Sequence, residues 1–196
     1  MENRSLQQLL HEAKQGNQQS FSEVVTMMQQ QVFRYCYLMI GNYHDAEEIV
    51  QEVFVRAYFN LAKYEETGSA SGWLFTIAHR LCLNSWKKQS RWKQLLIKAA
   101  SEEAVRQDKK EIGMEERLED RIENGTNRGM IILRSLPIKQ REIMILKVVH
   151  GMSYEEISKI VGGAPVNLRK QMERARKKLQ REHADNMKRG IVYEQR

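Results

Sequence analysis

The fold of this chain is indicated most clearly by residues 153–179, which read SYEEISKIVGGAPVNLRKQMERARKKL. Ser153 and Glu156 have the spacing of a capping box, in which each side chain bonds a free backbone N–H of the other residue. The short helix that follows is expected to end at Gly162-Gly163, and a longer basic helix is expected to begin near Pro165. Two helices joined by a short glycine turn are typical of a helix-turn-helix.

The second of these helices has a composition that favours DNA as its partner. Its apolar residues repeat on one side, which leaves seven basic residues for the other: Arg169, Lys170, Arg174, Arg176, Lys177, Lys178 and Arg181. Early residues of such a helix can enter the major groove, where all four base pairs differ, and later ones can neutralise phosphates. The alternatives are a helical hairpin with a charged outer face and, less favoured because the heptad is short, a coiled coil.

Working outward, apolar positions at helical spacing predict a nearly all-helical chain. Four amphipathic helices are expected at about 5–15, 20–40, 45–61 and 71–90, the second of them opened by a capping box of Ser20 and Glu23. Further helices are expected at about 130–136 and from 137 to Gly151. We therefore predict an all-α fold of two small helical domains, residues 1–95 and 128–185. A flexible linker at 96–127, rich in both acidic and basic residues and partly helical, should join them. The C-terminal domain should be a helix-turn-helix.

The charge of the chain is concentrated at one end. The net charge is +7, yet residues 1–89 carry 8 Lys and Arg against 9 Asp and Glu, whereas residues 129–196 carry 15 against 7. A basic C-terminal third indicates a polyanionic partner, although a solvated charged helix would look similar.

Cysteine usage and hydropathy predict a cytoplasmic protein. Cys36 and Cys82 lie in apolar helical patterns with no second ligand at metal-binding spacing, so we expect buried thiols, no metal and no cofactor. No signal peptide and no run of roughly 18 apolar residues is present, so direct membrane insertion is not expected.

Several short motifs together resemble the sigma factors of bacterial RNA polymerase. Leu136-Pro137, Gln140-Arg141-Glu142, Gly151–Ile157 and Arg174–Leu179 are similar, in this order, to the fourth conserved region of that family. Independently, Asp45–Ala57 resembles the polymerase-binding helix of the second region, and Trp73–Lys88 resembles the adjoining minus-ten segment. The family's third domain has no counterpart, which matches the compact extracytoplasmic-function (ECF) class.

The resemblance implies three sets of functional residues. The set expected to bind core polymerase is Asp45, Glu48, Gln51, Glu52 and Arg56. The set expected to bind minus-ten DNA is Arg80, Asn84, Lys87, Lys88 and Arg91, beside a loop at 65–72 where a flipped base would be captured. The set expected to bind minus-thirty-five DNA is Asn167, Arg169, Lys170, Gln171 and Arg174. Each of Trp73, Trp86 and Trp92 could stack on bases or belong to the core, and the core is favoured for Trp73.

Three positions depart from the family pattern. Pro165 stands one residue later than usual in the turn, Gln171 replaces a common basic residue, and Arg80 replaces a common asparagine. The start of the recognition helix and the base preference are therefore the features expected to differ from other members.

The implied function is promoter selection and melting, with core RNA polymerase, promoter DNA and an anti-sigma factor as partners. A stand-alone helix-turn-helix regulator would explain residues 129–183 but not the two N-terminal motifs. An enzyme is not expected, because the five histidines are scattered and neither a nucleophile motif nor a phosphate loop is present.

Overall fold

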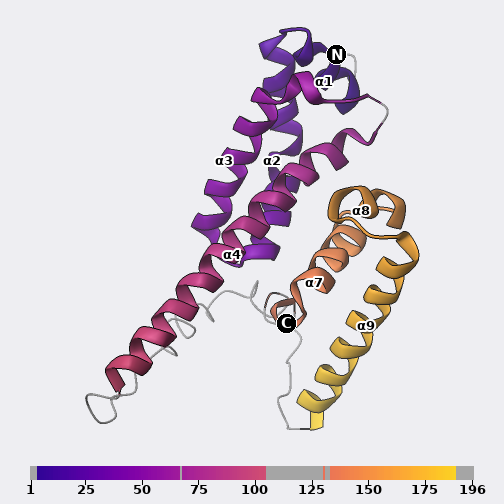
Figure 1. Ribbon diagram of the computed structural model, residues 1–196. Helices are drawn as coiled ribbons and strands as arrows, with labels where there is room; N and C mark the ends of the chain where they lie inside the picture. The colour runs from indigo at the N-terminus through magenta and orange to yellow at the C-terminus, as the bar shows by residue number, and fades with distance from the viewer. Residues whose placement is uncertain (1–3, 67, 105–129, 131–132, 189–196) are drawn as a thin grey trace.

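The computed structural model describes residues 4–66, 68–104, 130 and 133–188, and within these ranges the chain forms only helices and turns (Figure 1). The N-terminal unit consists of α1 (Leu6–Lys14), α2 (Gln18–Ile40), α3 (Tyr43–Phe59), the 3-10 turn η1 (Leu61–Lys63) and α4 (Ala70–Ala104). The C-terminal unit consists of α7 (Ile138–Met144), the π-helical turn η2 (Ile145–Val149), α8 (Tyr154–Val161) and α9 (Pro165–Lys188). The predicted all-α fold is confirmed.

Helix α2 is the centre of the N-terminal unit, where it packs against α1, α3 and α4. Its residues Val32, Tyr35 and Cys36 are completely buried, as are Val53 of α3 and Leu74 of α4. These positions follow the helical spacing of apolar residues in the sequence, because packing of an apolar face provides most of the stability of such helices.

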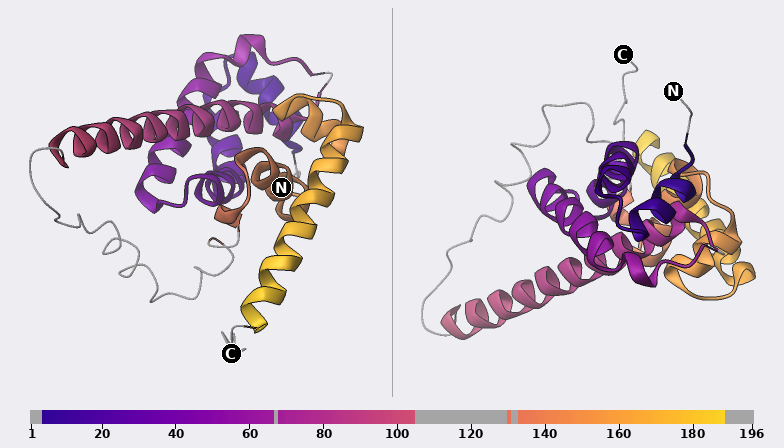
Figure 2. Two further views of the ribbon diagram at one scale, coloured as in Figure 1. Left: turned by 60° about the horizontal axis from the view of Figure 1, so that its bottom comes forward. Right: turned by 90° about the horizontal axis from the view of Figure 1, so that it is seen from above.

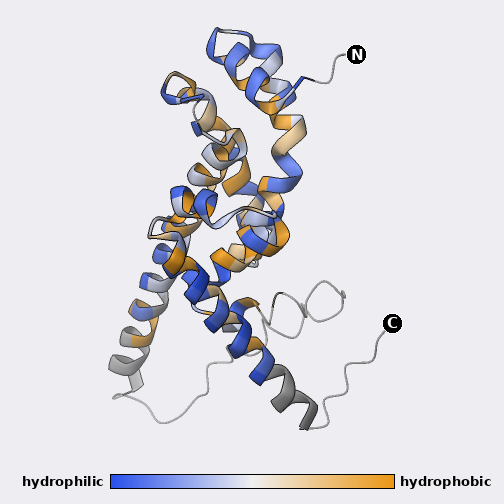
Figure 3. Cartoon of the chain, turned by 90° about the vertical axis from the view of Figure 1, so that its right-hand side faces the viewer, coloured by the Kyte–Doolittle hydropathy of each residue, from blue (hydrophilic) through white to orange (hydrophobic). Residues whose placement is uncertain are grey.

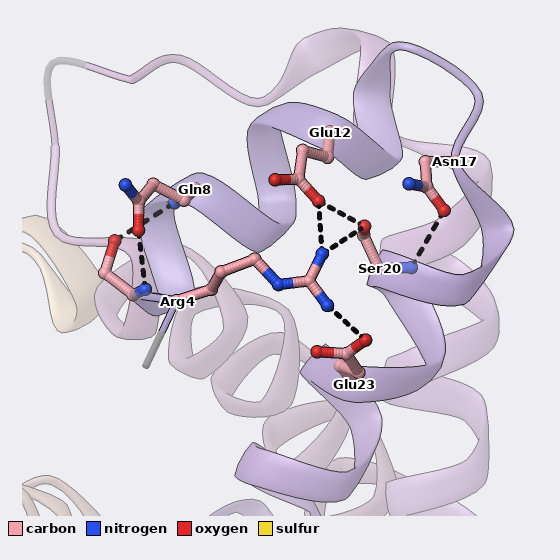
Figure 4. Close-up of polar contacts among 7 residues, drawn as sticks. Arg4, Gln8, Glu12, Asn17, Ser20 and Glu23 are labelled. Atoms are coloured by element: carbon pink, nitrogen blue, oxygen red, sulfur yellow. Dashed lines mark hydrogen bonds and ion pairs between the residues drawn. The ribbon is translucent and has the colours of Figure 1, made fainter. Parts of the chain in front are cut away.

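The start of α2 differs from the prediction. Asn17, not Ser20, is the N-cap, and its side chain accepts from the backbone N–H of Ser20 at 3.2 Å. Ser20 is buried in the first turn and donates its hydroxyl to Glu12 at 2.5 Å. The side chain of Arg4 bonds Glu12 at 2.8 Å and also pairs with Glu23, so α1 and α2 are joined by a polar cluster (Figure 4). Ser20 and Glu23 therefore connect helices instead of capping one.

Helix α8 begins and ends, and α9 begins, where the sequence predicts. The backbone N–H of Glu156 donates to the Ser153 hydroxyl at 3.1 Å, and the Glu156 carboxylate accepts from the Ser153 N–H at 2.9 Å. Helix α8 ends at Gly162, whose φ of 74° is a conformation that glycine adopts without strain. Pro165 is the first residue of α9, where its missing N–H costs nothing.

Helix α4 is much longer than predicted. The sequence pattern predicts an end near Ser90, but the helix continues to Ala104 and forms the first part of the 96–127 linker. Residues 91–104 are mostly Lys, Gln, Leu, Ala and Glu, which are strong helix formers. The C-terminal half of α4 extends away from the other helices (Figures 1 and 2). Residues 105–127 of the predicted linker lie outside the described residues.

The two units pack directly against each other. Helix α8 packs against α4, and α7 and η2 contact α2, although the segments are far apart in sequence (Figure 2). One cluster of buried apolar side chains includes Tyr35 and Phe75 of the N-terminal unit and Ile143 and Ile157 of the C-terminal unit. The sequence predicted two domains but not this contact between them.

The capping box of α8 can be tested by removing the cap oxygen. We expect S153A to lower the free energy of unfolding by about 1 kcal/mol, because the first turn of α8 loses its side-chain acceptor. Urea denaturation measures the difference. S22A is the matched control, since the Ser22 hydroxyl only bonds the Gln18 carbonyl within α2 and its loss should cost less than about 0.5 kcal/mol. Equal losses in the two variants would contradict the capping role.

Candidate functional site

One face of α3 carries the residues predicted to bind polymerase. The helix starts after Asn42, whose side chain accepts from the Asp45 N–H at 3.1 Å. Glu48, Gln51 and Arg56 are exposed, and Arg56 donates to the half-buried Glu52 at 2.5 Å. The structure thus places the five predicted residues on one helix with most of their charges in solvent.

The same face also carries apolar side chains that the sequence analysis did not single out. Val55 is 49% exposed and Phe59 is 79% exposed, and both follow Glu48 and Glu52 at helical spacing. Large exposed apolar residues next to charges are typical of protein–protein contacts, which have an apolar centre and a polar rim. In the sequence, the only indication of this apolar surface is Phe59 at the end of an amphipathic pattern.

Four of the five predicted minus-ten residues surround one surface hollow. Asn84, Lys87, Lys88 and Arg91 line a space of about 560 Å³ on α4, together with Trp92 and Leu95. Arg80 is exposed one turn earlier and is not among the lining residues. A basic hollow with an exposed aromatic ring can bind phosphates and stack a base.

The three tryptophans have different environments. Trp73 is partly buried against the core with its ring centroid 5.2 Å from that of Tyr64, which agrees with the favoured core role. Trp86 is 41% exposed and Trp92 is 59% exposed. These two are therefore accessible to a partner.

Of the loop predicted at 65–72, residues 70–72 already belong to α4, and the described part before them is held by α1. Gln7 donates to the Glu66 carbonyl at 2.8 Å, and the His11 ring lies 2.5 Å from the Glu66 carboxylate. Lys14 donates to the carbonyl of Tyr64, the buried residue that precedes the loop. Helix α1 lies outside the motifs that suggested a function, so the sequence did not show its role in positioning this loop.

A second hollow lies between this loop and α8. It has a volume of about 540 Å³, and its lining residues include Ser69 and Trp73 of the N-terminal unit and Glu156 and Lys159 of α8. The loop predicted to capture a base therefore faces the helix-turn-helix in this structure.

Helix α9 separates a packing face from a polar face. Leu168, Met172 and Ala175 are buried, while the exposed side is dominated by hydrophilic residues (Figure 3). The exposed side includes four of the predicted minus-thirty-five residues: Asn167, Arg169, Lys170 and Arg174. Gln171, the fifth, is half-buried and accepts from the Gln140 side chain of α7 at 3.2 Å.

Arg169 is oriented by an aromatic ring. Its guanidinium carbon lies 5.5 Å from the ring centroid of Tyr154, the first residue of α8. The ammonium of Lys147 lies 5.1 Å from the same centroid. Both distances are within the range of cation–π attraction, so Tyr154 links the first turn of α9 to α8 and η2.

Glu156 and His150, which lie in and just before the helix-turn-helix, have lowered pKa values. Backbone and side-chain hydrogen bonds from Ser153 lower the pKa of Glu156, which stabilises its charged form in the capping box. Burial, and to a lesser degree the charge of Arg34, lowers the pKa of His150 to about 4. With this pKa, His150 is neutral at pH 7. Its ring centroid lies 4.6 Å from that of Phe75 and 6.2 Å from that of Tyr35.

In the described ranges, His, Cys, Asp and Glu side chains form no group of three that could hold a metal ion. Cys36 and Cys82 are both free and buried, as predicted. None of the helices between residues 4 and 188, the gaps aside, has the length and apolarity needed to cross a bilayer.

Two known family models match this chain. Residues 24–91 match the family model of sigma-70 region 2, and residues 132–179 match that of sigma-70 region 4, together more than half of the chain. The chain belongs to the ECF sigma factors of the sigma-70 family. Helices α3 and the first part of α4 thus lie in region 2 of this sigma factor, and α8 and most of α9 lie in region 4.

Similar proteins cover nearly the whole chain. The ECF RNA polymerase sigma factor SigW of Bacillus subtilis (strain 168) is 28% identical over 179 residues, which are 90% of this sigma factor and 95% of SigW. Two solved structures share its fold. CnrH, in complex with the cytosolic domain of CnrY, has a TM-score of 0.69 at 20% identity, over 92% of this chain and 97% of that one. RpoE from Bartonella quintana, in complex with the anti-sigma factor NepR, has a TM-score of 0.59 at 21% identity, over 82% and 94%.

The neutral state of His150 predicts a dependence of stability on acid. The pKa of this residue is about 4 in the folded chain and 6.5 when unperturbed. The stability due to neutral His150 is therefore complete above about pH 6.5, declines as the pH falls toward 4, and is lost below that value. We expect H150F, whose ring has a similar shape but cannot take up a proton, to reduce this decline. Denaturation midpoints between pH 7 and 4.5 measure it.

The control for this prediction is H44F, because the side chain of His44 is 89% exposed. H44F should decline with acid as the wild type does. The same decline in H150F would show that protonation of His150 does not control the acid sensitivity.

Proposed function

We propose that this ECF sigma factor binds core RNA polymerase, recognises minus-ten and minus-thirty-five promoter elements and enables transcription initiation, as part of a stress or envelope regulon. The observation that carries the proposal is the presence of both matched regions, each with an exposed charged face on its own helix. We assign the region 2 domain to residues 1–95, the linker to 96–127 and the region 4 domain to 128–185.

The polymerase contact is assigned to the α3 face. Asp45, Glu48, Gln51, Glu52 and Arg56 provide its polar part. Val55 and Phe59 add an apolar surface that would otherwise be exposed to water. A contact of this kind gains most from the buried aromatic side chain, while the surrounding charges choose the partner and its orientation.

The minus-ten contact is assigned to the 65–72 loop and to the basic hollow of α4. The free-energy cost of unstacking a base must be offset by contacts in a protein pocket. The loop lies beside a space large enough for a base. The hollow formed by Asn84, Lys87, Lys88 and Arg91 would bind the adjoining backbone, with Trp92 available for stacking. We also assign Arg80 to the minus-ten contact, because it is basic and exposed.

The minus-thirty-five contact is assigned to the first turns of α9. Asn167, Arg169, Lys170 and Arg174 are exposed there, and arginine can bind the edge of a guanine with two hydrogen bonds. Gln171 must release its bond to Gln140 to bind adenine through both atoms of its amide, so its contribution should be weaker than that of Arg169.

The remaining partners follow from the family. We infer that an anti-sigma factor binds this protein, because the solved relative RpoE is in complex with the anti-sigma factor NepR. The protein is inferred to act in the cytoplasm, without inserting into the membrane and without catalytic activity or a cofactor of its own. A stand-alone helix-turn-helix regulator is not favoured, because it has no use for region 2.

Transcription with purified core polymerase tests the proposal. We expect the wild-type chain to direct run-off transcripts from a subset of a promoter library, and F59A to weaken polymerase binding at least tenfold. That factor corresponds to about 1.4 kcal/mol, a modest loss for an aromatic residue at the centre of an interface. M27A is the control, because Met27 is also exposed but lies on α2. No transcript from a folded wild-type chain would refute the proposal.

The contact between Tyr154 and Arg169 gives a prediction about base preference. Cation–π attraction at an exposed site contributes about 0.5–1 kcal/mol, so Y154A should reduce discrimination at the base read by Arg169 a few-fold. Y154F keeps the ring and should behave as the wild type. Selection from randomised minus-thirty-five sequences measures the effect. A uniform loss of affinity, with discrimination unchanged, would contradict a positioning role.

A further inference from the structure

A buried carboxylate joins the two regions. Glu142 of α7 is 2% exposed, and its Oε1 accepts the hydroxyl of Tyr35 at 2.6 Å and contacts the His79 ring. Tyr35 lies on α2 and His79 on α4, so both partners come from region 2. A buried carboxylate is strongly unfavourable without such partners, and it would be exposed to water if the regions separated.

Two arginines of the C-terminal unit bond the end of α2. Arg141 donates to the Met39 carbonyl at 3.0 Å, and Arg134 donates to the Ile40 carbonyl at 3.1 Å. These carbonyls belong to the last turn of α2 and lack partners within the helix, where a cation is also favoured by the helix dipole. Gly41 allows this contact, because a Cβ there would overlap the Arg134 guanidinium.

The apolar part of the interface surrounds these polar bonds. The His150 ring packs against Tyr35 and Phe75, and α8 packs against α4. Phe75 and Tyr35 are themselves in edge contact, with ring centroids 5.4 Å apart. The interface therefore combines a carboxylate oxygen that has two partners with aromatic packing, and this combination is typical of a specific contact.

This arrangement cannot read both promoter elements at once. Elements named minus ten and minus thirty-five are about 25 base pairs apart, or roughly 85 Å of B-form DNA. In the structure Glu156 and Lys159 of region 4 instead line the same hollow as the base-capturing loop of region 2. The chain from Ala104 to Met130 can span about 85 Å when extended, so separation of the regions is sterically allowed.

We propose that Glu142, Tyr35 and His79 form an interdomain latch that holds this sigma factor in a closed, autoinhibited state. The latch is defined by contacts within the chain, and only its inhibitory consequence rests on the proposed function. Opening of the latch separates region 4 from region 2 and exposes the 65–72 loop. The fraction of open molecules then limits the apparent affinity for the promoter.

Energy transfer between two dyes tests whether the latch holds the regions together. Dyes are placed on Q30C and Q180C, which are exposed positions of α2 and α9, while Cys36 and Cys82 are completely buried and remain unlabelled. We expect high transfer in the wild type and lower transfer in Y35F and E142A. Y35F removes a single hydroxyl, so it tests the latch even if E142A fails to fold. Y37F, two residues along the same helix, is the matched control and should leave transfer high.

Transcription with core polymerase then tests whether the closed state inhibits. If Y35F raises the open fraction tenfold, the concentration of sigma factor that gives half-maximal run-off transcript should fall about tenfold. Transfer in Y35F and E142A equal to that in Y37F would overturn the latch. Lower transfer without a change in the half-maximal concentration would overturn its inhibitory role. No transcript from any variant or the wild type would refute the sigma function separately, because the transfer measurement does not need polymerase.

Discussion

The burial of the Glu142 carboxylate is the constraint on which the arrangement of this protein depends. A carboxylate removed from water must find donors, and here they come from Tyr35 and His79 on two different helices of the other unit. Because each helix must keep its register for these atoms to meet, the pairing determines how α7 lies against α2 and α4. Aromatic packing of His150 alone would allow many orientations, since apolar contacts have little directional preference.

This constraint divides the functional surfaces into two groups. The α3 face with Phe59 and the basic hollow of α4 lie away from the interface and are accessible in the closed arrangement. The loop at 65–72 instead shares its hollow with α8. A partner that binds α3 therefore meets no competition from region 4, whereas capture of a promoter base by the loop does. Polymerase binding and promoter reading thus depend differently on the same internal contact.

Much of the fold could be predicted because helix ends are determined locally. The capping box of Ser153, the glycine turn after α8 and the start of α9 at Pro165 each depend on residues within one or two turns. The Ser20 prediction was wrong because Asn17 offers a cap three residues earlier and Ser20 is used by Glu12. The minus-ten residues Asn84 to Arg91 could be grouped because they share one helix. The interface could not be predicted, since Tyr35 and Glu142 are 107 residues apart and neither is unusual for its own helix.

The Gln140-Arg141-Glu142 motif illustrates how one short segment serves both its own region and the interface. Gln140 bonds Gln171 of α9, and Arg141 donates to the carbonyls of Leu133, Arg134 and Leu136, so both support region 4 by itself. Only Glu142 depends wholly on region 2 for its partners among the bonds described here. Substitution of Tyr35 or His79 should therefore weaken the contact between the regions and leave the bonds within region 4 intact. The strength of closure therefore depends partly on α2 and α4, which lie outside region 4.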